Sequence, residues 1–90
     1  MREHYYKIEW HPNAERQFKK IKEQNLKDQI LEIIEFQIAR DPLIGKPLTG
    51  AFLGTRSFRL GVLRILYKFY KDRLIIVILS VEHRRQVYRR

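Results

Sequence analysis

The chain has 90 residues and a mass of 11.0 kDa, which suits a single domain spanning residues 1–90 with a thin core. With 44% hydrophobic and 32% charged residues, few glycines and prolines and no cysteine, it is neither a low-complexity chain nor one built on disulfides or zinc–thiolate sites. Its formal net charge of +9 at pH 7 indicates a polyanionic partner, with nucleic acid the first candidate.

The N-terminal half predicts one strand followed by two helices. Residues 6–10 alternate between large apolar and charged side chains, a period of two that is typical of a strand. Pro12 then suits the first turn of a helix, where its missing N–H costs nothing. Asn25 is the expected N-cap of a second helix, which ends before Pro42 because the residue preceding a proline is driven out of the helical region. The two helices, expected to form an antiparallel hairpin, carry the apolar stripes Ala14, Phe18 and Ile21, and Leu26, Ile30, Ile33, Ile34 and Ile38.

The C-terminal half predicts a loop and then three strands. Residues 42–54 contain two prolines and three glycines and are expected to form the loop. Strands are expected over 57–60, 63–70 and 74–81, separated by short turns. The last of them begins with six apolar residues that do not alternate, so it is predicted to be buried on both faces in the sheet centre. The element order β-α-α-β-β-β predicts an α+β fold, in which a small, mainly antiparallel sheet packs against the N-terminal helical hairpin.

The positive charge is concentrated in the second half of the chain. Residues 1–42 hold eight basic and eight acidic side chains, whereas residues 43–90 hold eleven basic and only two acidic ones. A cationic half of a folded domain favours nucleic acid or an acidic protein as the partner. The longest apolar run, residues 74–79, is too short to span a bilayer, and the N-terminus lacks the apolar segment of a signal peptide. We therefore expect a cytoplasmic protein that does not bind a membrane.

Few side chains could carry catalytic chemistry. His4, His11 and His83 lack metal-ligand spacing, and carboxylates are scarce where the basic residues gather, so neither a metal site nor a cofactor is expected. His11, just before the helix, is expected at the surface or as a helix cap. A single arginine often serves only to protect a strand edge. Arg64 is different, because it lies inside an apolar strand where an unpaired arginine is rarely tolerated.

Three segments carry a more specific pattern. They are LTG at 48–50, RLGVLRILY at 59–67 and VEHRRQVY at 81–88. Together with the opening Tyr-x-Ile-x-Trp strand and the Pro-x-Ala helix start, this order resembles the RelE/ParE superfamily of toxin–antitoxin toxins over essentially the whole chain.

The resemblance to the RelE branch implies an enzyme, a metal-independent endoribonuclease that cleaves messenger RNA in the ribosomal A site and so inhibits translation. In that reaction the RNA 2′-hydroxyl attacks the adjacent phosphate, leaving a cyclic or 3′-phosphate and a 5′-hydroxyl. The implied catalytic residues are Arg59, Arg64, His83, Arg84 and Tyr88, and the residues expected to bind RNA are Lys46, Arg56 and Arg85.

The resemblance also assigns individual roles. Arg64 matches the arginine on the scissile phosphate, Arg84 the arginine that stabilises transition-state charge, and Tyr88 the tyrosine that stacks on the cleaved nucleotide or protonates near it. The sequence departs from the best-known branch at its two catalytic lysines, which are replaced by Ser57 and Arg59. An arginine binds phosphate but cannot accept the hydroxyl proton, because it stays protonated at any physiological pH.

The departure leaves the proton acceptor open. His83 is a candidate, since Arg84 and Arg85 beside it disfavour its charged form and should keep it neutral near pH 7. The alternative is that His83 only orients the C-terminal tail.

The resemblance further implies a RelB-like acidic antitoxin, the ribosome and messenger RNA as partners, with the toxin–antitoxin complex forming a higher oligomer. One alternative is a ParE-like toxin that inhibits DNA gyrase without nuclease activity. Another is a basic RNA-binding module without toxicity. The joint presence of Arg64, Arg84 and Tyr88 favours the nuclease.

Overall fold

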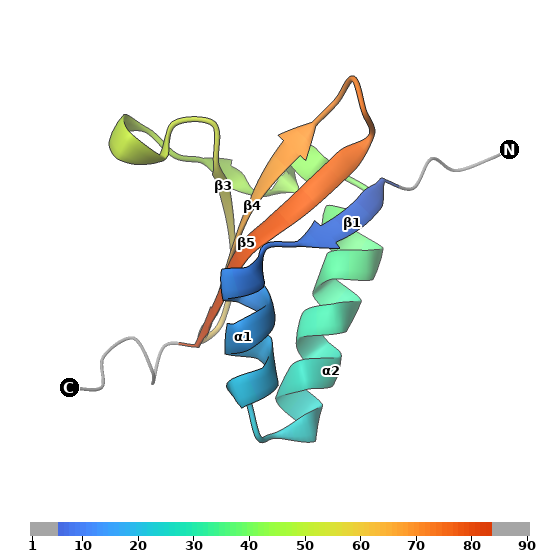
Figure 1. Cartoon of the computed structure of the whole chain (residues 1–90), viewed down its shortest axis with the longest axis vertical. Coiled ribbons are helices and arrows are strands. Elements are labelled where there is room, and N and C mark those ends of the chain that lie inside the picture. Colours follow the sequence, from blue (N-terminus) through green and yellow to red (C-terminus); the bar gives the residue numbers. More distant parts are fainter. Residues whose placement is uncertain (1–5, 84–90) are drawn as a thin grey trace, which may run out of the picture.

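A five-stranded mixed sheet, with its strands in the order β1-β5-β4-β3-β2, organises the fold (Figure 1). The computed structural model describes residues 6–83. β1 pairs with β5 in parallel, and the other neighbouring strands are antiparallel. The predicted α+β fold with a mainly antiparallel sheet is confirmed, and the short β2 adds a strand within the predicted loop. The strands are β1 (Lys7–Trp10), β2 (Lys46–Pro47), β3 (Arg56–Leu60), β4 (Leu63–Tyr70) and β5 (Ile75–His83).

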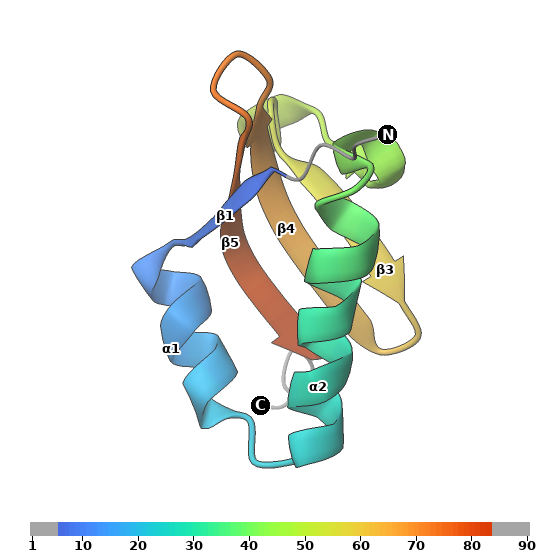
Figure 2. The same cartoon turned by 90° about the vertical axis from the view of Figure 1, so that its right-hand side faces the viewer.

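Two helices, α1 (Pro12–Lys20) and α2 (Gln24–Ile33), run in opposite directions and lie on the same face of the sheet (Figures 1 and 2). Their predicted apolar stripes lie between the helices and the sheet, where Ile30, Ile65 and Ile78 are fully buried. Burying such side chains contributes roughly 1.5–3 kcal/mol each. The predicted helical hairpin is therefore confirmed. No helix within residues 6–83 is long and apolar enough to cross a membrane.

The helix starts differ in how well they were predicted. His11 caps α1 as expected: its Nδ1 accepts a hydrogen bond from the Asn13 N–H at 3.0 Å, and Pro12 occupies the first helical position. The prediction of Asn25 as the second N-cap is wrong, because α2 begins at Gln24 with Glu23 as its cap. The buried Ile21 anchors a link of only three residues, so helical hydrogen bonding begins earlier than the Asn25 signal indicated.

The second helix ends in a π-helical turn, Ile34–Ile38, in which the Ala39 N–H donates to the Ile34 carbonyl at 2.8 Å. The wider turn has a packing consequence. Ile33 and Ile34 are buried, and so are Ile38 and Ala39 five residues later. Five residues of ordinary α-helix would rotate the second pair well away from the first, whereas the π-turn keeps both on the core side.

The strand predicted over 74–81 begins one residue later than expected. Leu74 belongs to the turn that joins β4 to β5, and its φ of 57° lies in the left-handed region that a branched side chain rarely adopts. The Lys7 N–H donates to the Leu74 carbonyl at 2.9 Å, which ties this turn to β1. Leu74, which was expected to be buried in the strand, thus lies exposed in the turn.

The prediction that β5 is buried on both faces in the sheet centre is also wrong. β5 lies between β1 and β4, and the central strand is β4. Ile76 and Ile78 are fully buried beneath the helices, but Ile75 and Val77 are only half-buried. The helices α1 and α2 both lie on the opposite face of the sheet (Figures 1 and 2). The apolar run therefore reflects strand propensity rather than burial on two sides.

Side chains of α1 hold the last part of β5. Beyond Trp10, which pairs with Ile78, β1 no longer covers the edge of β5. There the Asn13 amide donates to the Leu79 carbonyl at 3.2 Å, and the Val81 N–H donates to Gln17 Oε1 at 2.9 Å. These two bonds satisfy backbone groups that would otherwise lack a strand partner, and they position the end of β5.

Tyr67 packs in the core, and its hydroxyl anchors the loop before β2. The hydroxyl donates to the Pro42 carbonyl at 2.6 Å and accepts from the Gly45 N–H at 2.9 Å. Burial raises the pKa of this phenol above its ordinary value of 10.0, although the Gly45 hydrogen bond and the nearby Arg56 charge oppose the shift. A neutral, fully bonded phenol thus joins β4 to the end of the helical hairpin.

Candidate functional site

Two arginines face each other across β3 and β4. Arg59 pairs directly with Arg64, and Arg64 pairs in turn with Glu82 on β5. Leu63 and Ile65, on either side of Arg64, are buried beneath the helices, so Arg64 points to the other face of the sheet. The three charged residues therefore form a row across the face that no described helix covers.

Arg64 is held by an ion pair. Its Nε and Nη2 both donate to Glu82 Oε1, at 2.9 and 2.7 Å, and the Ser80 hydroxyl donates to Glu82 Oε2 at 3.3 Å. The Arg64 side chain is 43% exposed and that of Glu82 is 22% exposed. The pair explains how β4 accommodates an arginine between buried residues, and it leaves the guanidinium accessible to a ligand.

The face that carries this row is mainly basic. Lys46 pairs with Ser57, which lies on the same side of β3 as Arg59, and Lys68 pairs with Val77 farther along β5. Glu9 and Glu82 are the acidic residues that the register places on this side. Most other acidic residues belong to the helical hairpin: Glu15, Glu23, Asp28, Glu32 and Glu35. The hairpin also carries the basic residues Arg16, Lys19, Lys20, Lys22, Lys27 and Arg40, so its charges nearly balance, whereas the sheet face has a surplus of positive charge.

Two of the predicted site residues lie apart from this face. Arg56 pairs with Tyr67 on the helix-covered side, where its Nη1 donates to the Gly45 carbonyl at 2.6 Å and to the Leu43 carbonyl at 3.3 Å. His83 pairs with the buried Leu63, so the register also directs it to the helix-covered side. The structure therefore brings together Lys46, Arg59 and Arg64, but not Arg56 or His83. Arg84, Arg85 and Tyr88 lie outside the described residues.

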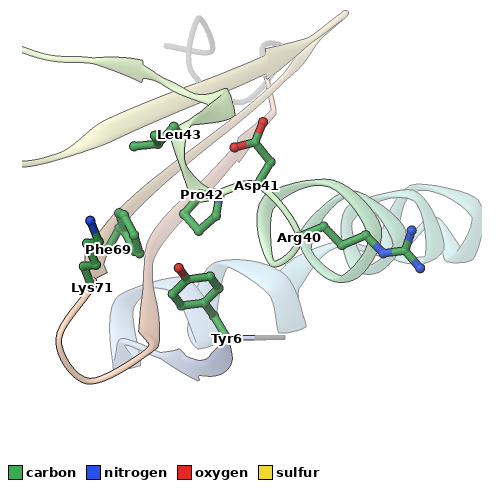
Figure 3. A pocket seen from close by; sticks show the side chains of 7 residues that line it. All are labelled: Tyr6, Arg40, Asp41, Pro42, Leu43, Phe69 and Lys71. Atoms are coloured by element: carbon green, nitrogen blue, oxygen red, sulfur yellow. The ribbon is translucent and has the colours of Figure 1, made fainter. Parts of the chain in front are cut away.

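A pocket of ≈ 610 Å³ lies toward the other end of β4 (Figure 3). Tyr6, Pro42 and Phe69 contribute its apolar wall, while the Arg40 side chain extends away from the other lining residues. None of the predicted site residues within 6–83 lines it. Nor do His, Asp and Glu side chains within residues 6–83 gather in a group of three that could hold a metal ion.

Sequence reasoning overlooked Glu82 and Ser80. Both lie in the last strand at a spacing of two, which places them on one face, and Glu82 is one of only two acidic residues in the second half. That isolation among basic residues was the available signal. The partner of Glu82 could not be read from it, because the register of β4 and β5 contains a bulge near Leu66 and Tyr67.

Comparison with known proteins gives consistent matches. The family model described as the ParE toxin of type II toxin–antitoxin systems, parDE, matches residues 8–88. Toxin RelG of Mycobacterium tuberculosis (strain ATCC 25618 / H37Rv) is 42% identical over 62 residues, which are 64% of this chain and 71% of that protein.

Solved structures agree with these matches. A chain of the toxin–antitoxin complex RelBE2 from Mycobacterium tuberculosis is 32% identical with a TM-score of 0.84, over 89% of this chain and 92% of that one. A chain of the intact E. coli RelBE toxin–antitoxin complex has a TM-score of 0.72 over 87% of this chain and 95% of that one. At 14% identity, the second likeness concerns the fold alone.

Proposed function

This chain belongs to the RelE/ParE family of type II toxin–antitoxin toxins, and from that premise we propose that it is an endoribonuclease that cleaves messenger RNA in the ribosomal A site. The observation that carries the proposal is the direct pairing of Arg59 with Arg64 on a basic, uncovered face. Like charges directly opposite each other destabilise a sheet. Such a pair gains stability when an anion such as a phosphate lies between the two guanidinium groups.

In the proposed reaction, the 2′-oxygen of the RNA loses its proton and forms a bond to the adjacent phosphorus. The bond from phosphorus to the 5′-oxygen breaks, and the leaving 5′-oxygen takes up a proton from solvent water. The products are a 2′,3′-cyclic phosphate, or a 3′-phosphate after hydrolysis, and a 5′-hydroxyl. Arg59 and Arg64 bind the scissile phosphate and stabilise the charge that develops on its oxygens. Arg84 adds to this stabilisation and Tyr88 stacks on the cleaved nucleotide. Lys46 binds RNA from the same face and Arg56 contacts RNA beyond it; Arg85 is a further RNA-binding residue of the proposal.

The proton acceptor for the 2′-hydroxyl is His83. Neither Ser57 nor Arg59 can take up a proton near neutral pH, whereas imidazole is the side chain best suited to do so. Because His83 pairs with Leu63, its ring must reach the substrate around the end of β5.

The proposed partners are the ribosome, its message and an acidic RelB-like antitoxin. The similar solved structures include chains described as toxin–antitoxin complexes, and the basic face of this chain offers charge complementarity to an acidic protein. We propose that this complex is a higher oligomer and that the protein acts in the cytoplasm.

A second candidate function is inhibition of DNA gyrase without nuclease activity. The description of the matching family model as a ParE toxin favours it. Induced expression separates the two functions, because cleavage of messages stops incorporation of labelled amino acids, whereas gyrase inhibition triggers a DNA-damage response. The decisive test is cleavage of a message on purified, programmed ribosomes. If the message stays intact and the protein inhibits DNA supercoiling by gyrase, the chain is a gyrase inhibitor and not a nuclease.

A further inference from the structure

Glu82 is a charged residue of the basic face that the proposed reaction does not use. A carboxylate on this face repels the phosphate that the arginines would bind. Yet Glu82 is bound from both sides, by Arg64 on Oε1 and by Ser80 on Oε2. We propose that Glu82 is a positioning residue, which holds the Arg64 guanidinium in the orientation needed to bind the scissile phosphate. The inference rests on the proposed cleavage of messenger RNA.

The three side chains in contact, Ser80, Glu82 and Arg64, become more exposed to solvent in that order. Ser80 is 6% exposed and donates to the Glu82 carboxylate, which is in turn less exposed than the Arg64 side chain that it binds. A buried hydroxyl therefore fixes the carboxylate, and the carboxylate fixes the more accessible guanidinium. The rotation of the long Arg64 side chain is therefore restricted by Glu82, which is itself held by the buried Ser80.

The pair leaves Arg64 able to bind a ligand. A guanidinium has five N–H donors, and Glu82 engages only Nε and one N–H of Nη2. The remaining donors can contact a phosphate. Glu82 also offsets the repulsion between Arg64 and Arg59, which face each other directly across β3 and β4. Without the carboxylate, this repulsion would turn Arg64 away from Arg59.

If Glu82 positions Arg64, loss of the carboxylate should strengthen RNA binding and slow RNA cleavage. Replacing Glu82 by glutamine removes a negative charge from the basic face and keeps the side-chain length, so RNA should bind about threefold more tightly. Cleavage should nevertheless slow by about tenfold or more, because a displaced guanidinium no longer matches the transition state. A residue that only stabilised the fold would change both quantities in the same direction.

The experiment compares the wild type with Glu82→Gln, Glu82→Asp and Glu9→Gln. Single-turnover cleavage is measured on programmed ribosomes at saturating protein. Affinity is measured on ribosomes whose message carries a 2′-deoxynucleotide at the scissile position and so lacks the attacking hydroxyl. Glu9→Gln is the matched control, because it removes the same charge from an exposed position on the same face. Glu9 pairs with Val77, which lies roughly 15 Å from Glu82 along β5.

We expect slower cleavage with tighter binding for Glu82→Gln. Glu82→Asp should cleave more slowly at nearly unchanged affinity, since it keeps the charge but shortens the reach to Arg64. Glu9→Gln should cleave like the wild type. Wild-type cleavage by a folded Glu82→Gln protein overturns the inference alone, as does weaker binding accompanied by slower cleavage. A wild type that leaves the message intact refutes the proposed function, and the role of Glu82 falls with it.

Discussion

The hydroxyl oxygen of Tyr67 lies 2.6 Å from the point that a β-carbon on residue 45 would occupy, so Tyr67 and Gly45 are matched to each other across the core. The φ of Gly45 is −75°, which any residue can adopt. Glycine is therefore needed here for space rather than for backbone freedom. The contact joins β4 to the loop that leads from the helical hairpin to the sheet.

Gly45→Ala should destabilise the protein by about 1–3 kcal/mol, because the new methyl group meets a buried ring that cannot move aside. Tyr67→Phe should cost about 2–4 kcal/mol, since it leaves the Pro42 carbonyl and the Gly45 N–H without their partner. In the double variant the clash with the oxygen is absent, so the combined cost should fall short of the sum by about 1 kcal/mol. Urea unfolding measures all three values, and simple additivity would contradict the proposed contact. Tyr70→Phe, at an exposed tyrosine, is the control.

Stability should fall at alkaline pH through Tyr67. Its pKa is raised in the folded protein, so the folded state keeps a proton that the unfolded state releases. The resulting stabilisation is fully present below pH 10, the ordinary pKa, and is lost as the pH rises through the folded-state value. The difference in unfolding free energy between the wild type and Tyr67→Phe should therefore narrow above about pH 10. A constant difference from pH 8 to 11 would exclude this origin.

Leu74→Asn should raise the melting temperature. Leu74 has a φ of 57° and is 48% exposed, and asparagine adopts the left-handed region at lower cost than leucine. The backbone bond from Lys7 to Leu74 does not depend on the side chain, so a gain of about 0.5–1 kcal/mol is expected. Leu53→Asn is the control, because Leu53 is also exposed but has a φ of −55°. Equal effects at both positions would show that backbone strain at Leu74 is not the cause.

Arg64→Ala should reduce message cleavage by about a hundredfold, the cost of one lost donor to a transition-state phosphate. Its stability should change by less than about 1 kcal/mol, since the pair with Glu82 is partly exposed to water. Arg64→Lys should restore only part of the rate, because an ammonium group cannot make the two bonds of a guanidinium fork. Native circular dichroism together with undiminished arrest of translation by Arg64→Ala would remove Arg64 from the site.

His83→Ala should slow single-turnover cleavage by about a hundredfold, within the usual range for loss of a general base. Binding to the uncleavable 2′-deoxy message should be nearly unchanged, which separates a role in proton transfer from one in RNA affinity. His83→Ala protein that cleaves at the wild-type rate would show that the acceptor is another group. The pairing of His83 with Leu63, away from the arginine row, makes this the most informative variant of the proposed mechanism.

Local patterns predicted the elements that depend on neighbouring residues. The strand over 63–70 was predicted with its observed bounds, because β-favouring residues fill it and turn residues flank it. Pro12 likewise marked the start of α1. Asn25 failed as a cap because the chain is already helical at Gln24, where the Lys27 N–H donates to the Glu23 carbonyl. The strand at 74–81 was misjudged because its composition reports strand propensity and not what covers each face.

The sequence by itself determined the fold class, the family resemblance and the concentration of positive charge in the second half, since these follow from periodicity, motif order and composition. Only the tertiary structure decided which of those charges meet. Strand register pairs Arg59 with Arg64 and Arg64 with Glu82, and the same register sends Arg56 and His83 to the other side. The reason is the two-residue period of a strand: a shift of one position, or one bulge, moves a side chain to the opposite face.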